Sequence, residues 1–254
     1  MSATEPPGHD WNASAYDELP LPHERWGAAL LGRLALSGDE HVLDAGCGTG
    51  RDTALLLERL PRGHVTAVDA SDAMLTRLRN RLAGMTERLT VRQADLRSPL
   101  NLVRPVAAVI SVATLHWVPD HALVFQNFAA AMEPGAQLAL ECGGRGNIDG
   151  VLAAVHRATG DDSSEIGWHF ADAVTTERLL VESGFVDVHV RLREDPARLQ
   201  SRALLRDYLS TVILGRHLAG LEPGERPGFV DAVAAEMPEP VIDYARLEVI
   251  ARRR

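Results

Sequence analysis

Short apolar runs alternate along the chain with longer stretches in which apolar and polar residues are mixed. Val106–Val112 is nearly continuous in apolar residues, which is typical of a strand buried on both faces of a parallel sheet. Seven such runs are predicted strands: His41–Asp44, His64–Asp69, Leu89–Ala94, Val106–Val112, Gln137–Glu141, Phe185–Leu192 and Tyr244–Ala251. The alternation predicts an α/β fold with helices on both faces of a mainly parallel sheet.

Capping residues mark several of the intervening helices. Ser71 is a suitable N-cap for one helix, and Gly84 follows its end. Pro61 ends an earlier helix, and Pro134 follows a third, in which Val124 and Phe128 share one face. The predicted helices are Asp52–Leu60, Ser71–Ala83, Asp120–Met132, Val151–Thr159 and Thr176–Ser183, with an amphipathic stretch at His23–Leu36.

Two segments interrupt this alternation, at about residues 143–172 and 195–240. The first is rich in Gly and Asp, and the second is mostly helical. We expect both to be lid insertions over the open edge of the sheet, the alternative being helices that only pack on the core. A chain of 254 residues fits one large domain with insertions. The predicted organisation is an arm and helix over 1–40, followed by a single domain over 41–254.

A glycine-rich loop follows the first predicted strand, in Asp44-Ala45-Gly46-Cys47-Gly48-Thr49-Gly50. Glycine permits a tight turn and brings bare peptide groups against a ligand, and the next helix offers unpaired N–H donors. Dinucleotide sites favour G-x-G-x-x-G, whereas this loop reads G-x-G-x-G with an acidic residue beside it that would repel a pyrophosphate. The chain has no lysine, which excludes a phosphate-binding P-loop. The loop therefore predicts a nucleoside cofactor of another kind, the alternative being an ordinary Gly-rich turn.

Acidic residues end the next two predicted strands. Asp69 lies 19 residues after Gly50, where a carboxylate accepts hydrogen bonds from ribose hydroxyls, although it could instead belong to the helix start at Ser71. Asp95 could accept from an adenine amine, with the Leu96 N–H facing a ring nitrogen, or be a solvent-exposed loop residue. Ala70 and Met74 would flank the adenine, and Met74 could equally be helix core.

The loop after the fourth strand runs from Ser111 to Asp120 and opens at the same edge. His116 could orient an acceptor or take its proton, because imidazole titrates near neutrality. Trp117 could form the wall of the acceptor pocket or be a core aromatic residue.

The order of these motifs resembles the class I S-adenosylmethionine (SAM)-dependent methyltransferases, and within them trans-aconitate methyltransferase and its relatives. The resemblance implies a Rossmann-like three-layer sandwich with strand order 3-2-1-4-5-7-6 and strand seven antiparallel. It spans nearly the whole chain and is specific in the cofactor half only. Two features depart from the family pattern: His116 stands where Gln is frequent, and Gly143–Asn147 is richer in Gly. The motifs that carry the resemblance are Trp11-Asn12 with Tyr16, Leu43–Gly48, Asp69 with Ser71–Leu75, Ala113–His121 and Val249–Arg253.

The resemblance implies SAM as methyl donor, S-adenosylhomocysteine as product, and a small-molecule acceptor. Asp44 would favour the ammonium and sulfonium of SAM, and Tyr16 its carboxylate. Arg145 would bind an acceptor carboxylate, the alternative being a surface Arg on a turn. The residues expected at the cofactor are Tyr16, Asp44, Gly46, Cys47, Gly48, Gly50, Asp69, Ala70, Met74, Asp95, Leu96 and Ser111. Those expected at the acceptor are His116, Trp117 and Arg145. Trp168, His169 and Tyr208 lie in the two lid segments and are weaker candidates for the acceptor pocket, the alternative being a purely structural role.

The acceptor class stays open at this point. A carboxylate oxygen, as in trans-aconitate, is ionised at neutral pH and needs no base. The alternatives are a larger apolar acceptor methylated on oxygen, nitrogen or carbon, with His116 as base, or a SAM-binding cyclase or binding module that transfers no methyl group.

Composition narrows the partners. The net charge of −9 argues against nucleic-acid binding. The two cysteines suit a reducing cytoplasm and form neither a disulfide framework nor a zinc site. We find no apolar run of membrane-spanning length, no signal-peptide pattern and no acidic cluster after the fourth strand that would hold a metal. The sequence thus predicts a cytoplasmic, metal-independent enzyme without membrane or nucleic-acid partners, and leaves its oligomeric state open.

Overall fold

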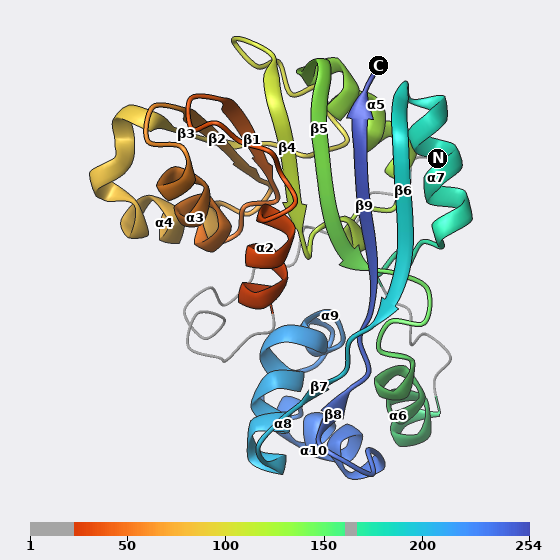
Figure 1. Cartoon of the computed structure of the whole chain (residues 1–254). Helices are drawn as coiled ribbons and strands as arrows, with labels where there is room; N and C mark the ends of the chain where they lie inside the picture. The colour runs from red at the N-terminus through yellow and green to blue at the C-terminus, as the bar shows by residue number, and fades with distance from the viewer. Residues whose placement is uncertain (1–22, 161–166) are drawn as a thin grey trace, which may run out of the picture.

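A seven-stranded sheet organises the computed structural model, which describes residues 23–160 and 167–254. The order is β3-β2-β1-β4-β5-β9-β6, and β9 runs antiparallel to both of its neighbours (Figure 1). The predicted order, with its last strand inserted antiparallel between the fifth and sixth, is therefore confirmed. The strands of this sheet are β1 (His41–Ala45), β2 (His64–Asp69), β3 (Leu89–Gln93), β4 (Val106–Val112), β5 (Met132–Gly143), β6 (Phe185–Glu194) and β9 (Ala245–Arg253).

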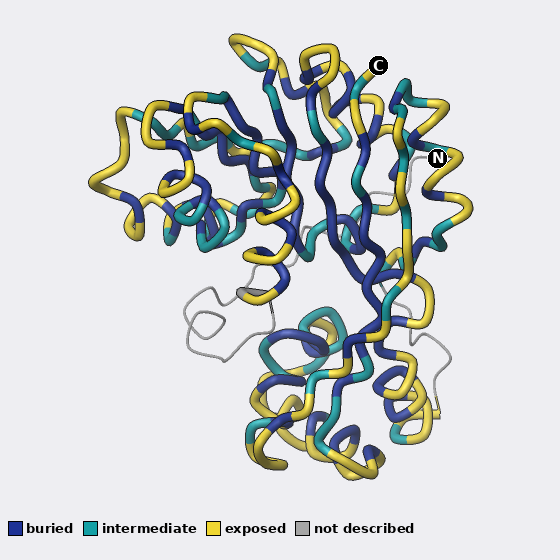
Figure 2. Tube along the Cα trace, in the orientation of Figure 1, coloured by how far each residue is buried: buried dark blue, intermediate teal, exposed yellow. Residues whose placement is uncertain are grey.

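Helices cover both faces of the sheet. Successive residues of a strand point to opposite faces, so Val42 packs in one hydrophobic core and Leu43 in the other. The first core includes residues of α2 (His23–Leu31), α3 (Arg51–Arg59) and α4 (Asp72–Arg81), and the second those of α5 (His121–Ala131) and α7 (Ala173–Glu182). The central strands are buried along their length (Figure 2).

A smaller helical lobe lies beyond the carboxyl ends of β4 and β5 (Figure 1). Its core, which includes Leu205 and Val233, is continuous with the sheet face that carries α2, α3 and α4. Two short strands, β7 (Ala197–Arg198) and β8 (Val241–Ile242), pair where the chain enters and leaves the lobe. The lobe helices are α6 (Asp149–Thr159), α8 (Arg202–Tyr208), the π-helical turn η4 (Leu209–Ile213), α9 (Gly215–Ala219) and α10 (Arg226–Glu236).

Two boundaries differ from the sequence prediction. Helix α5 ends at Ala131 and β5 begins at once, so Pro134 and Gly135 lie in a strand rather than in a turn that ends the helix. The pairing of β4 with β5 shifts register between Val106 and Ala108, which makes room for the irregular start of β5. The helix predicted to end at Ala83 is divided between α4 and the 3-10 helix η1 (Ala83–Arg88). The remaining 3-10 turn, η2 (Leu115–Trp117), follows β4.

Part of the predicted arm, including Trp11, Asn12 and Tyr16, lies outside the described residues. Within residues 23–160 and 167–254, we find no helix that is long and apolar enough to cross a membrane.

Candidate functional site

A cavity of about 1210 Å³ opens at the carboxyl ends of β1, β2, β3 and β4, where residues of the sheet edge and of the helical lobe line it. Ligands of open α/β sheets bind at this edge. One wall is formed by the loops that follow the strands, and the other by residues of the lobe and β9. The site residues predicted from the sequence that line it are Gly46, Cys47, Gly48, Asp69, Ala70, Met74, Asp95, Leu96, His116, Trp117, Trp168 and His169.

The glycine loop presents bare peptide to the cavity. Gly46 has φ +79°, and a Cβ there would run into the Thr114 side chain. Gly48 has φ +51° and open space where a Cβ would stand, so its peptide group lines the cavity. Both conformations favour glycine over other residues. The third glycine, Gly50, is the N-cap of α3 and packs against Leu78 rather than lining the cavity.

Asp69 ties the glycine loop to the end of β2. Its Oδ2 accepts from the Gly48 N–H and its Oδ1 from the Ser71 N–H, each at 2.9 Å. A carboxylate has about four acceptor positions, so two remain for a ligand's hydroxyl groups. Burial raises the pKa of Asp69, and the backbone hydrogen bonds oppose that rise. The alternative role predicted for Asp69, as part of the helix start, is also present. Asp69 accepts from the Ser71 N–H, and Ser71 caps α4 by accepting from the Met74 N–H.

Asp95 lines the cavity but already has a charged partner. The Arg97 guanidinium donates from Nη2 at 2.7 Å and from Nε at 3.1 Å. This pairing lowers the pKa of Asp95, so the group is ionised at neutral pH. The sequence gave no sign that Arg97, two residues after Asp95, pairs with it.

Two other predicted cofactor residues lie behind the cavity wall. Asp44 is 2% exposed and its Oδ2 accepts from the Thr53 Oγ1 at 2.5 Å. Burial, with the nearby carboxylates of Asp52 and Asp69, raises the pKa of Asp44 to about 8. It is therefore mostly protonated at neutral pH in this structure. Ser111 is buried and donates to the Ala45 carbonyl at 2.7 Å, which joins β4 to β1 below the loop.

His116 is buried and lines the cavity. Its Nδ1 accepts from the Gly143 N–H at 3.3 Å, so the neutral imidazole carries its hydrogen on Nε2. Its ring lies 5.1 Å from Trp117 and stacks with Phe170 at 6.2 Å. In this tautomer the nitrogen that would take a proton is already a hydrogen-bond acceptor.

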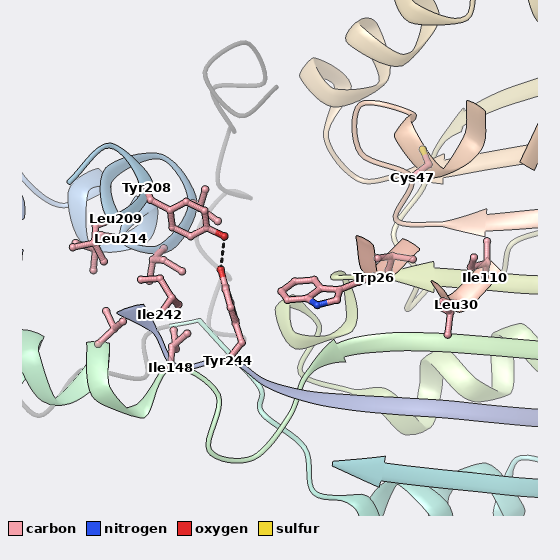
Figure 3. Close-up of a cluster of buried hydrophobic side chains, with 14 of the residues drawn as sticks. Trp26, Leu30, Cys47, Ile110, Ile148, Tyr208, Leu209, Leu214, Ile242 and Tyr244 are labelled. Atoms are coloured by element: carbon pink, nitrogen blue, oxygen red, sulfur yellow. Dashed lines mark hydrogen bonds between the residues drawn. The ribbon is translucent and has the colours of Figure 1, made fainter. Parts of the chain in front are cut away.

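Arg145 and Tyr208 do not reach the cavity. The Arg145 side chain is 73% exposed and pairs with Asp172 at 3.1 Å. Tyr208 is fully buried, and its hydroxyl shares a 2.7 Å hydrogen bond with that of Tyr244 (Figure 3). Tyr244 is the partner that lines the cavity.

Sequence reasoning missed several residues of the cavity wall that the lobe and β9 form, among them Arg216, Tyr244 and Arg246. Arg216 comes from α9 in the lobe, and its guanidinium lies 5.7 Å from the centre of the Trp117 ring. Arg246 is in β9 and is 1% exposed. The one signal for Arg246 was a charged residue inside a strand expected to be buried.

Known proteins resemble the chain in sequence and in fold. A family profile described as a methyltransferase domain matches residues 42–135. A trans-aconitate 2-methyltransferase of Methylobacterium radiotolerans is 30% identical over 237 residues, covering 88% of this chain and 87% of the relative. The chain belongs to the class I SAM-dependent methyltransferases. A trans-aconitate 2-methyltransferase of Acidovorax sp. is 35% identical over 133 residues, where the chain spans about half the length of that relative.

The fold agrees with this assignment. A putative sarcosine dimethylglycine methyltransferase of Galdieria sulphuraria superposes with a TM-score of 0.60 at 15% identity, covering 91% of this chain and 84% of that one. The cavity also fits the SAM nucleoside. Gly48 leaves space for close approach, Asp69 keeps acceptor capacity for the ribose, and Ala70, Met74 and Leu96 supply apolar surface near Asp95.

Proposed function

We propose that this methyltransferase esterifies a carboxylate of a small acceptor that carries more than one carboxylate, as the names of its relatives suggest. The observation that carries the proposal is the pair of guanidinium groups, Arg216 and Arg246, in the acceptor wall. Guanidinium matches carboxylate geometry and keeps its charge at all accessible pH values.

The chain's own contribution to such a reaction is binding and orientation. Bound SAM supplies an electrophilic methyl group: the O–CH₃ bond forms as the S–CH₃ bond breaks, the electron pair stays on sulfur, and no proton is exchanged. The carboxylate is ionised at neutral pH, so the residues need only hold it in line and exclude water. The His116 tautomer agrees with this division, because its Nδ1 already accepts from the Gly143 N–H and is not available as a base.

The lobe forms the far wall of the acceptor space. It contributes Val212, Ile213 and Arg216, and Gly167 packs directly against the Arg216 side chain. The Arg216 Nε is buried without a hydrogen-bond partner among the described residues. We propose that the two insertions act as the lid expected from the sequence, positioning Arg216 over the cavity and keeping water from the reacting oxygen.

A larger apolar acceptor is the second candidate. The observation in its favour is the aromatic surface of Trp117 and Trp168, whose rings lie 5.9 Å apart, with Phe170 stacked on Trp168. Such surfaces suit flat apolar ligands. Arg216 makes this candidate the weaker one, because an apolar acceptor would give its buried Nε no hydrogen-bond partner.

The test is methyl transfer to a panel of acceptors by the full-length protein. Trans-aconitate and other di- and tricarboxylates are compared with apolar phenols and amines, with S-adenosylhomocysteine release and product mass as readouts. We expect a methyl ester that mild base hydrolyses. If the protein binds SAM in calorimetry but methylates none of the carboxylates in the panel, the proposal is rejected.

A further inference from the structure

We infer that Arg246 holds a second carboxylate of the acceptor, one that is not methylated, and so selects acceptors that carry more than one carboxylate. This inference rests on the proposed function, because it requires a polycarboxylate acceptor. It adds a specificity-determining residue to that function.

Arg246 is an unusual arginine in this protein. It is 1% exposed and is the one fully buried arginine within residues 23–160 and 167–254, yet it lines the cavity. Its place in β9 opposite Gly143 of β5 brings it to the carboxyl end of the sheet, beside the loop that holds His116. The strand register therefore places a permanent positive charge at the inner end of the acceptor space.

One nitrogen of this guanidinium lacks a partner. Nε donates to the Glu141 Oε1 at 3.0 Å, whereas Nη2 is buried and has no hydrogen-bond partner among the described residues. A buried, charged donor without an acceptor is costly. A ligand carboxylate at the cavity wall would supply the missing acceptor and recover that cost, which favours acceptors that carry such a group.

The guanidinium is also held in place before any ligand arrives. Its Cζ lies 3.8 Å from the centre of the Trp26 ring, and that indole donates from Nε1 to Asp195 at 2.5 Å. Trp26 meets Tyr244 edge to face at 5.1 Å, as their opposed positions in Figure 3 show. Because packing from α2 and β9 already fixes the side chain, binding loses little rotamer entropy.

The charge balance supports an anionic ligand. Arg246 and Glu141 form a buried ion pair at 3.0 Å, in which each charge balances the other. Arg216 brings a further positive group to the same wall, and its Nε has no acceptor in the described part of the chain. The charge that favours an anionic ligand at this wall is therefore that of Arg216, while Arg246 offers the donor Nη2.

A carboxylate bound by Arg246 is a poor methyl acceptor. Its oxygen lone pairs are engaged by N–H donors, and its position is fixed at the wall. Methyl transfer then falls on another carboxylate of the same molecule.

The experiment compares Arg246→Gln and Arg246→Lys with wild type, using trans-aconitate as acceptor. For Arg246→Gln we expect KM for trans-aconitate to rise by about 10- to 100-fold, the loss typical of a charge-assisted hydrogen bond. Arg246→Lys keeps the charge but loses the bidentate geometry of the guanidinium, so the KM of this variant should lie between those of wild type and Arg246→Gln. The SAM Kd measured by calorimetry should stay within about twofold, because the contacts of Arg246 are with Glu141, Trp26 and Tyr244 and not with the glycine loop.

Controls separate anchoring from folding. Arg145→Gln removes an exposed guanidinium outside the cavity and should leave KM unchanged. Because Arg246→Gln leaves Glu141 buried without its partner, the double variant Glu141→Gln/Arg246→Gln is measured as well, with SAM binding as the check on folding. With crotonate, a monocarboxylate, the ratio of kcat/KM between wild type and Arg246→Gln should be near one.

The outcomes distinguish the two proposals. If wild type methylates no polycarboxylate, the proposed function fails. If wild type makes the ester but the SAM-binding variants keep the wild-type KM, the assignment of Arg246 is overturned while the proposed function stands.

Discussion

Replacing Asp44 by Asn should stabilise the protein, and increasingly so as the pH rises. Asp44 is buried, and its pKa rises from 3.8 to about 8 on folding. Between these values the folded state carries a proton that the unfolded chain lacks, so the stability of the wild type falls by about 1.4 kcal/mol per pH unit from this group. Asparagine has no such proton and can still accept from Thr53 through its amide oxygen.

The size of the effect is set by the pKa shift. The free energy of unfolding of Asp44→Asn should equal that of wild type near pH 4, exceed it by about 4 kcal/mol near pH 7, and by about 6 kcal/mol above pH 8. Because the pKa of Asp44 is raised in the folded state, its stabilising contribution is fully present below about pH 4 and is lost as the pH rises to about 8. Burial is the main cause, and the neighbouring Asp52 and Asp69 add to it.

Urea unfolding at a series of pH values, with both proteins in the same buffers, measures the difference directly. The matched control is Asp72→Asn, where the carboxylate is 70% exposed, and its difference from wild type should stay within about 0.5 kcal/mol at every pH. A stability difference for Asp44→Asn that does not change with pH would refute the reasoning, because it would mean that Asp44 is equally ionised in both states.

Three further predictions concern the site. Asp69→Asn should raise the SAM Kd by about tenfold or more in calorimetry, because the amide cannot accept from both Gly48 and Ser71; an unchanged Kd would contradict the role of Asp69. His116→Ala should lower kcat by less than about tenfold and leave the shape of the pH–rate profile unchanged, whereas a loss of about 100-fold or more would identify a proton transfer. Trp26→Phe should lower the free energy of unfolding by about 1–3 kcal/mol in urea, because Asp195 loses its indole donor; equal stability would show that Arg25 and Arg193 suffice.

The cofactor half of the site was readable from local sequence. The glycine loop, Asp69 and Asp95 each come at the end of a predicted strand, and parallel strands bring their carboxyl ends to one edge. Apolar runs located all seven strands of the main sheet, and the family resemblance supplied their order. These features are short-range, because a few neighbouring residues determine where a strand ends and which loop comes after it.

The direction of individual side chains and the acceptor wall were decided by the tertiary structure. Asp44 stands beside the glycine loop in sequence, but the packing of α3 turns its carboxyl toward Thr53, behind the cavity. Arg145 looked suited to bind an anion but lies outside the cavity, whereas Arg246 lines it because β9 pairs with β5, about a hundred residues away in sequence. A contact of this kind depends on strand register and on which helix packs above it, and no local pattern of residues encodes either.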